Sequence, residues 1–155
     1  MNYFLIARVT GLLLMLFSMT MITPLPFAWA FDEDPSTFLI AFLCTFVTGG
    51  ALWLFHAQRI TARRTRAADS GLQGELRSRD GFVITVLFYL GLGLYGALPL
   101  YLSEVAPDFT HAAFESLSGL TTTGATVLTG LDAMPRSLLF YRQQLQWLGG
   151  MGIIV

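Results

Sequence analysis

The sequence predicts an all-α protein that crosses a membrane several times. Of its 155 residues, 54% are hydrophobic and only 12% are charged, whereas about 25% of the residues of an ordinary soluble domain are charged. Three long stretches contain no charged residue at all: 9–31, 35–58 and 81–103. Each is as long as the roughly 20 residues that a helix needs to cross the hydrocarbon core of a bilayer. We therefore expect three membrane-spanning helices.

The composition also excludes several classes of protein. A net charge of −1 provides no basic surface for nucleic acid. The single cysteine, Cys44, can form neither an internal disulfide nor a zinc site of the CxxC type. Gly91, Gly93 and Gly96 match the GxGxxG pattern, but they lie inside an expected span, so we interpret them as small residues for close helix packing. We expect no cofactor, no catalytic residues and no nucleic acid partner.

The arginines predict the orientation of the chain in the membrane. All nine basic residues are Arg, and the loop between the second and third spans contains Arg59, Arg63, Arg64, Arg66, Arg77 and Arg79. Short loops rich in Arg stay in the cytoplasm. Residues 59–80 are therefore expected to form a cytoplasmic loop, with the N-terminus on the same side. The acidic loop residues then lie outside: Asp32, Glu33, Asp34, Glu104, Asp108 and Asp132.

The first span has a second interpretation. A cleavable signal peptide shares the features found here, which are Arg8, the apolar run after it, the helix breakers Pro24 and Pro26, and Ala28-Trp29-Ala30. Both interpretations place the following loop outside, so the expected topology of the remaining chain is the same. N-terminal sequencing of the membrane-extracted protein would decide between them.

After the third span comes a helix that is too short to cross. Pro107, Asp108 and Thr110 indicate a helix start, and apolar residues recur at helical spacing over residues 110–120. A helix over this range extends about 16 Å, roughly half the hydrocarbon thickness. The next stretch, 121–127, is rich in Thr and contains a glycine, so it is not expected to continue the helix.

This non-helical stretch predicts a pore. Irregular backbone at membrane depth is tolerated only where it is buried in protein or lines a wet cavity. Gly124 can adopt a positive φ angle, so neighbouring carbonyl groups can point toward one axis and replace the hydration shell of a cation. The partially negative C-terminal end of the preceding helix favours a cation at the same place. We predict a cation filter formed by backbone carbonyls.

Three segments resemble one known family: 114–126 (FESLSGLTTTGAT), 140–143 (FYRQ) and 146–152 (QWLGGMG). They are similar to the first pore repeat of the bacterial Trk/Ktr family of potassium uptake proteins, in particular its TrkH-type transmembrane subunit. Such proteins carry four linked repeats of helix, pore helix, filter loop and helix, as in potassium channels. The resemblance implies an extra helix pair at 1–58 and most of repeat one at 81–155, divided into a helix at 81–103, a pore helix at 110–120, a filter at 121–127 and a truncated helix at 136–155.

The resemblance also implies how potassium, the transported substrate, is bound. The family's filter glycine matches Gly124, and the carbonyls of Thr122 and Thr123 are the implied ion ligands, with those of Gly124 and Ala125 adjoining them. The filter has one glycine instead of the two of tetrameric channels, which suggests weaker selectivity among alkali cations. The implied setting is the bacterial inner membrane. The implied partners are membrane lipid, a second full-length subunit and a cytosolic nucleotide-binding regulatory subunit.

Two charges inside the expected pore repeat need an explanation. An ionisable residue at membrane depth is costly and normally has a partner, and the nearest candidate for Glu115 is Arg142. We predict that the pair is a structural brace between the pore helix and the next helix, with a relay role in transport as the alternative. His111 stands four residues before Glu115 on the same helix face, but no third ligand for a metal lies nearby.

The apolar run after Arg142 ends at Val155 without a charged flank. We therefore expect an N-terminal fragment that supplies one filter wall of four and does not transport alone. Two other function classes stay open. One is a polytopic membrane enzyme that uses Glu104, His111 and Glu115 for acid–base chemistry at the outer surface, and the other is a structural membrane subunit that does not transport. The enzyme hypothesis predicts that His111 is essential, whereas the pore hypothesis predicts that Gly124 is.

Overall fold

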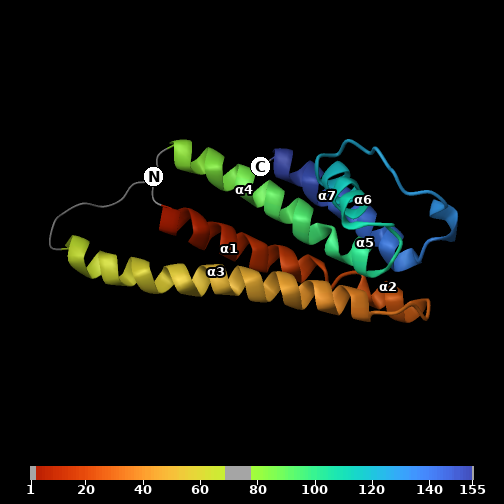
Figure 1. Cartoon of the computed structure of the whole chain (residues 1–155), viewed down its shortest axis with the longest axis horizontal. Coiled ribbons are helices and arrows are strands. Elements are labelled where there is room, and N and C mark those ends of the chain that lie inside the picture. The colour runs from red at the N-terminus through yellow and green to blue at the C-terminus, as the bar shows by residue number, and fades with distance from the viewer. Residues whose placement is uncertain (1–2, 69–77, 155) are drawn as a thin grey trace.

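The computed structural model describes the backbone of residues 3–68 and 78–154 and the side chains of residues 6–54 and 81–151. Every regular element in these stretches is a helix, which confirms the predicted fold class. Among the described residues, four helices have 18 or more residues and run lengthwise through an elongated molecule, and the short helices gather at one end (Figure 1).

The N-terminal helix pair consists of α1 (Tyr3–Thr20) and α3 (Ser36–Ala68), connected through the short α2 (Leu25–Ala30). The first span is therefore a broken helix, because prolines at 24 and 26 lack the N–H groups that would continue the hydrogen-bond ladder. The backbones of α1 and α3 touch where two glycines meet. A Cβ atom added to Gly11 would lie 2.7 Å from the carbonyl oxygen of Gly49, which is the close approach that small residues allow between membrane helices.

The segment expected to be a loop from residue 59 begins as helix. α3 continues to Ala68, and α4 (Ser78–Gly96) begins before the third apolar stretch. Residues 59–68 consist mostly of Ala and Arg, which are strong helix formers, so the helix outlasts its apolar part. Residues 69–77 lie outside the described part of the chain, as do the side chains of the arginines in this segment.

The third span is α4 followed by α5 (Leu98–Leu102). The two are nearly continuous, since the N–H of Ala97 bonds to the carbonyl of Gly93 in α4 at 3.2 Å and the carbonyl of Ala97 accepts from the N–H of Tyr101 in α5 at 3.0 Å. Within the described residues, three segments are long and apolar enough to cross a membrane: Ile6–Ala30, Ser36–Leu54 and Gly81–Leu102. They match the three stretches predicted from the missing charges.

The glycines inside α4 confirm that the GxGxxG pattern serves packing. A Cβ on Gly91 would lie 3.2 Å from the Leu14 side chain of α1, and one on Gly93 would lie 2.3 Å from the side chain of Leu117. α4 therefore packs between the N-terminal pair and the short helix that follows, and it leaves no space at these glycines for a nucleotide.

The last third of the chain folds into α6 (Phe109–Leu120), an irregular segment, the 3₁₀ turn Leu131–Ala133 and α7 (Arg136–Ile154). α6 is about 18 Å long, so it is a half-length helix as predicted. Tyr141 of α7 is fully buried. Its hydroxyl donates to the carbonyl of Gly96 at 2.9 Å, and its ring meets that of Phe38 edge-on. α7 is thus packed against both α3 and α4.

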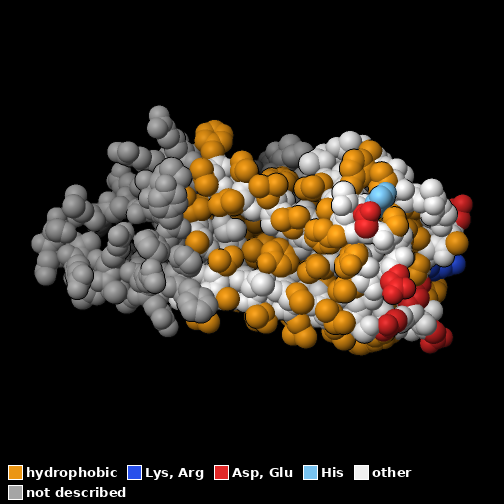
Figure 2. Space-filling view, in the orientation of Figure 1, with side chains coloured by type: hydrophobic (Ala, Val, Ile, Leu, Met, Phe, Trp, Pro, Cys, Tyr) orange, Lys and Arg blue, Asp and Glu red, His pale blue; other side chains and the backbone are white. Residues whose placement is uncertain are grey.

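The surface separates by chemistry along the long axis. Figure 2 shows exposed hydrophobic side chains over the middle of the molecule and acidic side chains gathered at the end that carries the short helices. The long helices expose large apolar side chains, among them Leu16, Val47 and Phe82. Such a band of apolar surface fits lipid or further transmembrane helices, not water.

Candidate functional site

The candidate site begins with α6, whose first residue, Phe109, lies within the helix start expected from the sequence. Asp108 is its N-cap, and the carboxylate accepts a hydrogen bond from the N–H of His111 at 2.8 Å. The imidazole Nδ1 of His111 lies 2.7 Å from the same oxygen. Hydrogen bonds from the His111 side chain and then from its backbone lower the pKa of Asp108. His111 is therefore bonded to the cap at the N-terminal end of α6.

α6 ends in a Schellman motif that has no glycine at its left-handed position. The N–H of Thr123 bonds to the carbonyl of Ser118 at 3.0 Å, and the N–H of Thr122 bonds to that of Gly119 at 2.9 Å. This motif places Thr122 in the left-handed region, with a φ of 56°. Glycine normally occupies that position, and a β-branched residue there is strained. The strained residue is one of the two implied ion ligands.

The segment that follows α6 presents free carbonyl groups. Gly124 has a φ of 72°, as its predicted role requires, and all residues from 121 to 127 are exposed. Within the described part of the chain, the carbonyl oxygens of Thr122, Thr123 and Gly124 accept no hydrogen bond. Because a backbone carbonyl is a strong acceptor that normally finds a partner, a row of unpartnered ones indicates a place for a ligand or for water.

Side chains of α6 form hydrogen bonds to residues 125–127 of the same segment. The hydroxyl of Ser118 donates to the carbonyl of Ala125 at 2.6 Å. The carboxylate of Glu115 accepts from the hydroxyl of Thr126 at 3.0 Å and from the N–H of Val127 at 3.3 Å. Irregular backbone is thereby satisfied by side chains on one side, while its carbonyls at 122–124 stay free.

The side chains of Glu115 and Arg142 form an ion pair. Nε of Arg142 donates to Oε1 of Glu115 at 2.9 Å, and its Nη2 donates to the same oxygen. The side chain of Glu115 is 3% exposed, and that of Arg142 is 16% exposed. Nη2 of Arg142 also reaches the hydroxyl of Thr126 at 3.3 Å. The contact expected between the two charges is present, and α6, α7 and the irregular segment meet at it.

α7 approaches the end of α6 at a glycine. A Cβ on Gly149 would lie 1.9 Å from the carbonyl oxygen of Leu120, so no larger residue fits without moving one of the two helices. A Cβ on the neighbouring Gly150 would lie 3.8 Å from the methyl group of Thr122, which is ordinary contact. The glycine-rich run is therefore tightly packed at Gly149, against the last residue of α6, which directly precedes the predicted filter.

This arrangement of half-length helix, irregular segment and return helix coincides with a known sequence family. Residues 38–155 match the sequence model of the TrkH family, which is described as a cation transport protein. The chain belongs to the TrkH family. The match covers nearly all of the second span, the third span and the helices and irregular segment of the candidate site.

Individual relatives of this TrkH-family chain extend the match to its whole length. It is 47% identical over 159 residues to the Trk system potassium uptake protein TrkH of Halomonas elongata, which covers 100% of this chain and 30% of that protein. It is also 47% identical over 158 residues to TrkH of Escherichia coli K12, with the same coverage. TrkG of the same strain is 38% identical over 152 residues, or 97% of this chain and 29% of TrkG. The chain thus spans about 30% of the length of its TrkH relatives.

Two of the three residues proposed for an acid–base site have other partners in this TrkH-family fold. Glu115 pairs with Arg142, and His111 pairs with Asp108. Glu104 is exposed in the loop after α5. Among the described residues, no group of three or more His, Cys, Asp or Glu side chains is placed to hold a metal ion.

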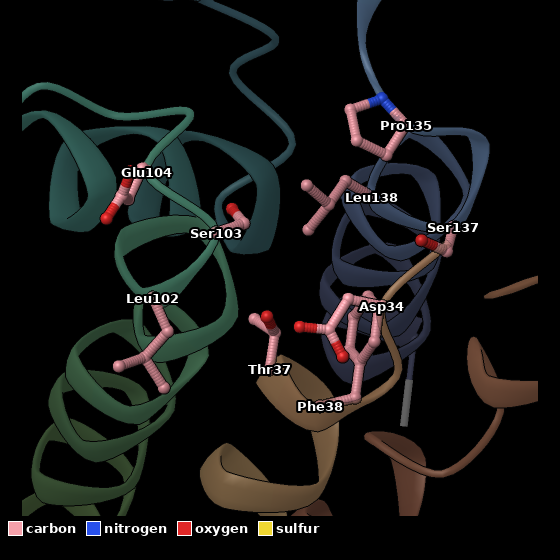
Figure 3. Close-up of a pocket in the computed structure, with 9 residues that line it drawn as sticks. All are labelled: Asp34, Thr37, Phe38, Leu102, Ser103, Glu104, Pro135, Ser137 and Leu138. Carbon is pink, nitrogen blue, oxygen red and sulfur yellow. The ribbon is translucent and has the colours of Figure 1, made fainter. Parts of the chain in front are cut away.

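A cavity of about 330 Å³ lies near the beginnings of α3 and α7 and the end of α5, and no filter residue lines it. Figure 3 shows Thr37, Asp34 and Leu138 pointing into the space opposite Ser103, while the carboxylate of Glu104 turns away. Asp34 itself caps α3 by accepting from the N–H and the hydroxyl of Ser36 at 2.9 and 2.7 Å. The cavity is a gap between the N-terminal pair and the pore repeat.

Sequence reasoning missed three features of this site. The strain at Thr122 was hidden, because three consecutive threonines do not reveal which one takes the left-handed conformation. Ser118 and Thr126 were quoted only as part of the resembling segment, although their hydroxyls hold the irregular backbone. A small hydroxyl residue near each end of a non-helical segment at membrane depth is the signal that could have found them, since such backbone must be satisfied locally.

Proposed function

We propose that this chain is the N-terminal part of a potassium uptake protein and forms one of four walls of its ion filter. The carbonyls of Thr122, Thr123 and Gly124 bind the dehydrated ion, and that of Ala125 adjoins them. The chain performs no covalent chemistry and needs no cofactor, and the potassium ion is its transported substrate.

The observation that carries this proposal is the row of unpartnered carbonyls at 122–124 in an exposed segment next to Gly124 at positive φ. Carbonyl oxygens replace the hydration shell of an alkali cation when several of them converge on one axis. Its relatives in Halomonas elongata and Escherichia coli are named potassium uptake proteins, which supports potassium as the cation.

The electrostatics of the site favour a cation. The C-terminal end of α6 lies directly before the free carbonyls, and the partial negative charge of a helix C-terminus attracts cations. Arg142 would oppose this, but its charge is paired with Glu115 behind the filter segment. The brace that we propose for this pair therefore has two effects: it joins α6 to α7, and it cancels a positive charge near the ion path.

The remaining parts of the proposal concern the whole protein. We propose a multi-pass protein of the bacterial inner membrane with a cytoplasmic N-terminus, residues 1–58 as an extra helix pair and residues 81–155 as repeat one. Acidic side chains gathered at one end of the molecule support the outside position of that end (Figure 2). TrkH-type architecture implies three partners for the whole protein: membrane lipid, a second full-length subunit and a cytosolic nucleotide-binding regulatory subunit.

Complementation of a bacterium deficient in potassium uptake tests the function. The full-length protein should restore growth at low potassium, Gly124→Ala should lose it, and His111→Ala should retain it, with membrane levels checked by immunoblot. Loss with His111→Ala but not with Gly124→Ala would instead support an enzyme. If neither variant changes growth beyond an effect on protein level, the chain is a structural subunit.

The single glycine of the filter allows a second measurement. We propose that purified full-length protein in liposomes prefers potassium over sodium less strictly than a two-glycine channel does, because fewer carbonyl rings are aligned. Flux of both ions under the same gradient measures the ratio. Sodium rejection as strict as that of a two-glycine channel would contradict this part of the proposal.

A further inference from the structure

The first turn of α7 is capped by a residue from the distant N-terminal pair. Oε1 of Glu33 accepts from the N–H of Arg136 at 2.6 Å, and Oε2 accepts from the N–H of Ser137 at 2.9 Å and from its hydroxyl. The first N–H groups of a helix have no partner inside the helix, and the residue before α7 is Pro135, which has no polar side chain to cap it. Glu33 supplies the missing cap from 103 residues away.

These contacts have a measurable electrostatic signature. Partial burial by itself would raise the pKa of Glu33, but the hydrogen bonds from Ser137 and Arg136 and the charge of Arg136 outweigh it and lower the pKa. The carboxylate is therefore charged at neutral pH and meets the positive end of the α7 dipole.

Glu33 is itself held in place at the turn between α2 and α3. Its N–H bonds to the carbonyl of Ala28 at 2.8 Å, and the preceding Asp32 has a left-handed φ of 54°. The next residue, Asp34, caps α3. A carboxylate fixed between two helix ends is a rigid support, whereas one on a free loop would follow α7 wherever it moves.

Three side chains on one face of α7 make further contacts with the N-terminal pair. The guanidinium of Arg136 lies 4.7 Å above the ring of Phe31, and the rings of Phe27 and Phe140 stack at 4.2 Å. Gln144 donates to the carbonyl of Thr20 at 2.8 Å and accepts from the hydroxyl of Thr23 at 2.7 Å. α7 residues 136, 140 and 144 are spaced by four, so they form one continuous helix face.

The same stretch of α7 carries Arg142, which contacts Glu115 and Thr126 of the pore segment. α7 is thus connected to the N-terminal pair through residues 136–144 and to the filter segment through Arg142. We infer that the N-terminal helix pair positions the filter through α7, and that Glu33 is the positioning residue. This inference rests on the proposed function, because it assigns the extra helix pair a role in ion selection.

Glu33→Gln in the full-length transporter tests the inference. The change keeps the size of the side chain, but it removes the charge and puts an amide donor among the N–H groups of α7. Amide hydrogen exchange in the first turn of α7 should become about tenfold faster, as expected for the loss of a helix cap. The Michaelis constant for potassium should rise, and the preference for potassium over sodium should fall.

Two further variants keep the test decisive. Glu104→Gln removes an equal charge from the same end of the molecule, at a side chain that makes no hydrogen bond within the described residues, and it should leave exchange and selectivity unchanged. Ser137→Ala removes only the hydroxyl donor to Glu33, so a smaller change of the same kind is expected. It remains measurable if Glu33→Gln does not fold.

Each outcome supports or overturns the inference. Faster exchange together with reduced selectivity in Glu33→Gln and Ser137→Ala supports it. Unchanged exchange overturns it, and so does faster exchange with unchanged selectivity and potassium affinity, because Glu33 would then be an ordinary helix cap. An equal loss of selectivity in Glu104→Gln would show that surface charge is responsible. If the wild-type protein takes up no potassium, the proposed function fails, whereas the exchange measurement still shows whether Glu33 holds α7.

Discussion

The N-terminal pair and the pore segment solve the same membrane problem by different means. In the pair of α1 and α3, every backbone group inside the helices is satisfied by the helix itself, and the two helices meet through Gly11 and Gly49 with apolar side chains around them. Between α6 and α7 the backbone is irregular, and the side chains of Ser118, Glu115 and Arg142 satisfy it or hold it in place.

The difference teaches where polar groups are needed in a membrane protein. A helix pair needs mainly close packing, because the backbone N–H and C=O groups within a helix bond to one another and need no partner from lipid. A segment that leaves its carbonyls free for an ion needs buried polar side chains on its other side. We expect substitutions in the pore segment to alter ion selection. Comparable substitutions at the contact of Gly11 with Gly49, which includes none of the residues that hold α7, should alter stability alone.

Breaking the buried ion pair should have the largest effect. Glu115→Gln or Arg142→Gln in the full-length protein leaves the other charge uncompensated, which costs about 3 to 5 kcal/mol when a buried pair loses one partner. The double variant should lose less than the sum of the single losses, because it leaves no unpaired charge. Unfolding of the purified protein in detergent, measured for all four combinations, gives the coupling energy. Additive losses would contradict a brace.

A substitution of the glycine at the contact between α6 and α7 should have the second-largest effect on stability. Gly149→Ala brings a methyl group to within 1.9 Å of the carbonyl oxygen of Leu120, so the helices must separate at a cost of about 2 to 3 kcal/mol. Because Leu120 directly precedes the filter segment, potassium uptake should fall as well.

Gly150→Ala is the matched control for this change, since its methyl group would meet only a side-chain methyl at 3.8 Å. It should leave stability unchanged or raise it slightly, because Ala is a better helix former than Gly. Equal losses in both variants would mean that glycine flexibility, and not the close contact, is required at this place.

The sequence predicted the N-terminal pair and the third span well, because missing charges are a strong signal of membrane helices. It predicted the half-length α6 and its Asp108 cap for similar reasons, since both are local features. It did not predict that α3 would continue to Ala68, because helix formation after the apolar stretch depends on Ala and Arg propensity and not on hydropathy.

The candidate site was predicted unevenly. The contact of Glu115 with Arg142 followed from the cost of charge at membrane depth, which leaves few partners to choose from. The cap by Glu33 could not be predicted in the same way. Several acidic residues stand in the loops at this end of the molecule, and only the folded chain shows which one meets the start of α7, 103 residues later.

Close packing in the N-terminal pair supplies a comparison with Gly149. Gly49→Ala would place its methyl group 2.8 Å from the carbonyl oxygen of Gly11 and 3.0 Å from the side chain of Met15. The cost is expected to be about 1 to 2 kcal/mol, because the pair can separate slightly. The potassium-to-sodium preference should stay at its wild-type value.

Gly50→Ala is the control here, because nothing lies within 4 Å of a Cβ at Gly50. Flux ratios in liposomes and unfolding in detergent measure the two properties separately. A selectivity loss in Gly49→Ala as large as in Gly149→Ala would remove the distinction between the two regions, and it would show that the whole helix pair is tightly coupled to the filter.

The smallest expected effect on stability comes from a hydroxyl behind the filter. Ser118→Ala removes the hydrogen bond of 2.6 Å to the carbonyl of Ala125, at a cost of about 1 kcal/mol. The same carbonyl then loses its support and is free to turn, so the potassium-to-sodium preference should fall more than the small loss of stability suggests.

Ser116→Ala is the matched control two residues earlier, since the hydroxyl of Ser116 is buried without a partner among the described residues. Its removal should leave stability unchanged or improve it, and selectivity should not move, because deleting an unsatisfied polar group relieves a desolvation cost. Equal changes in both variants would show that the carbonyl of Ala125 is positioned by the backbone alone, without the hydroxyl of Ser118.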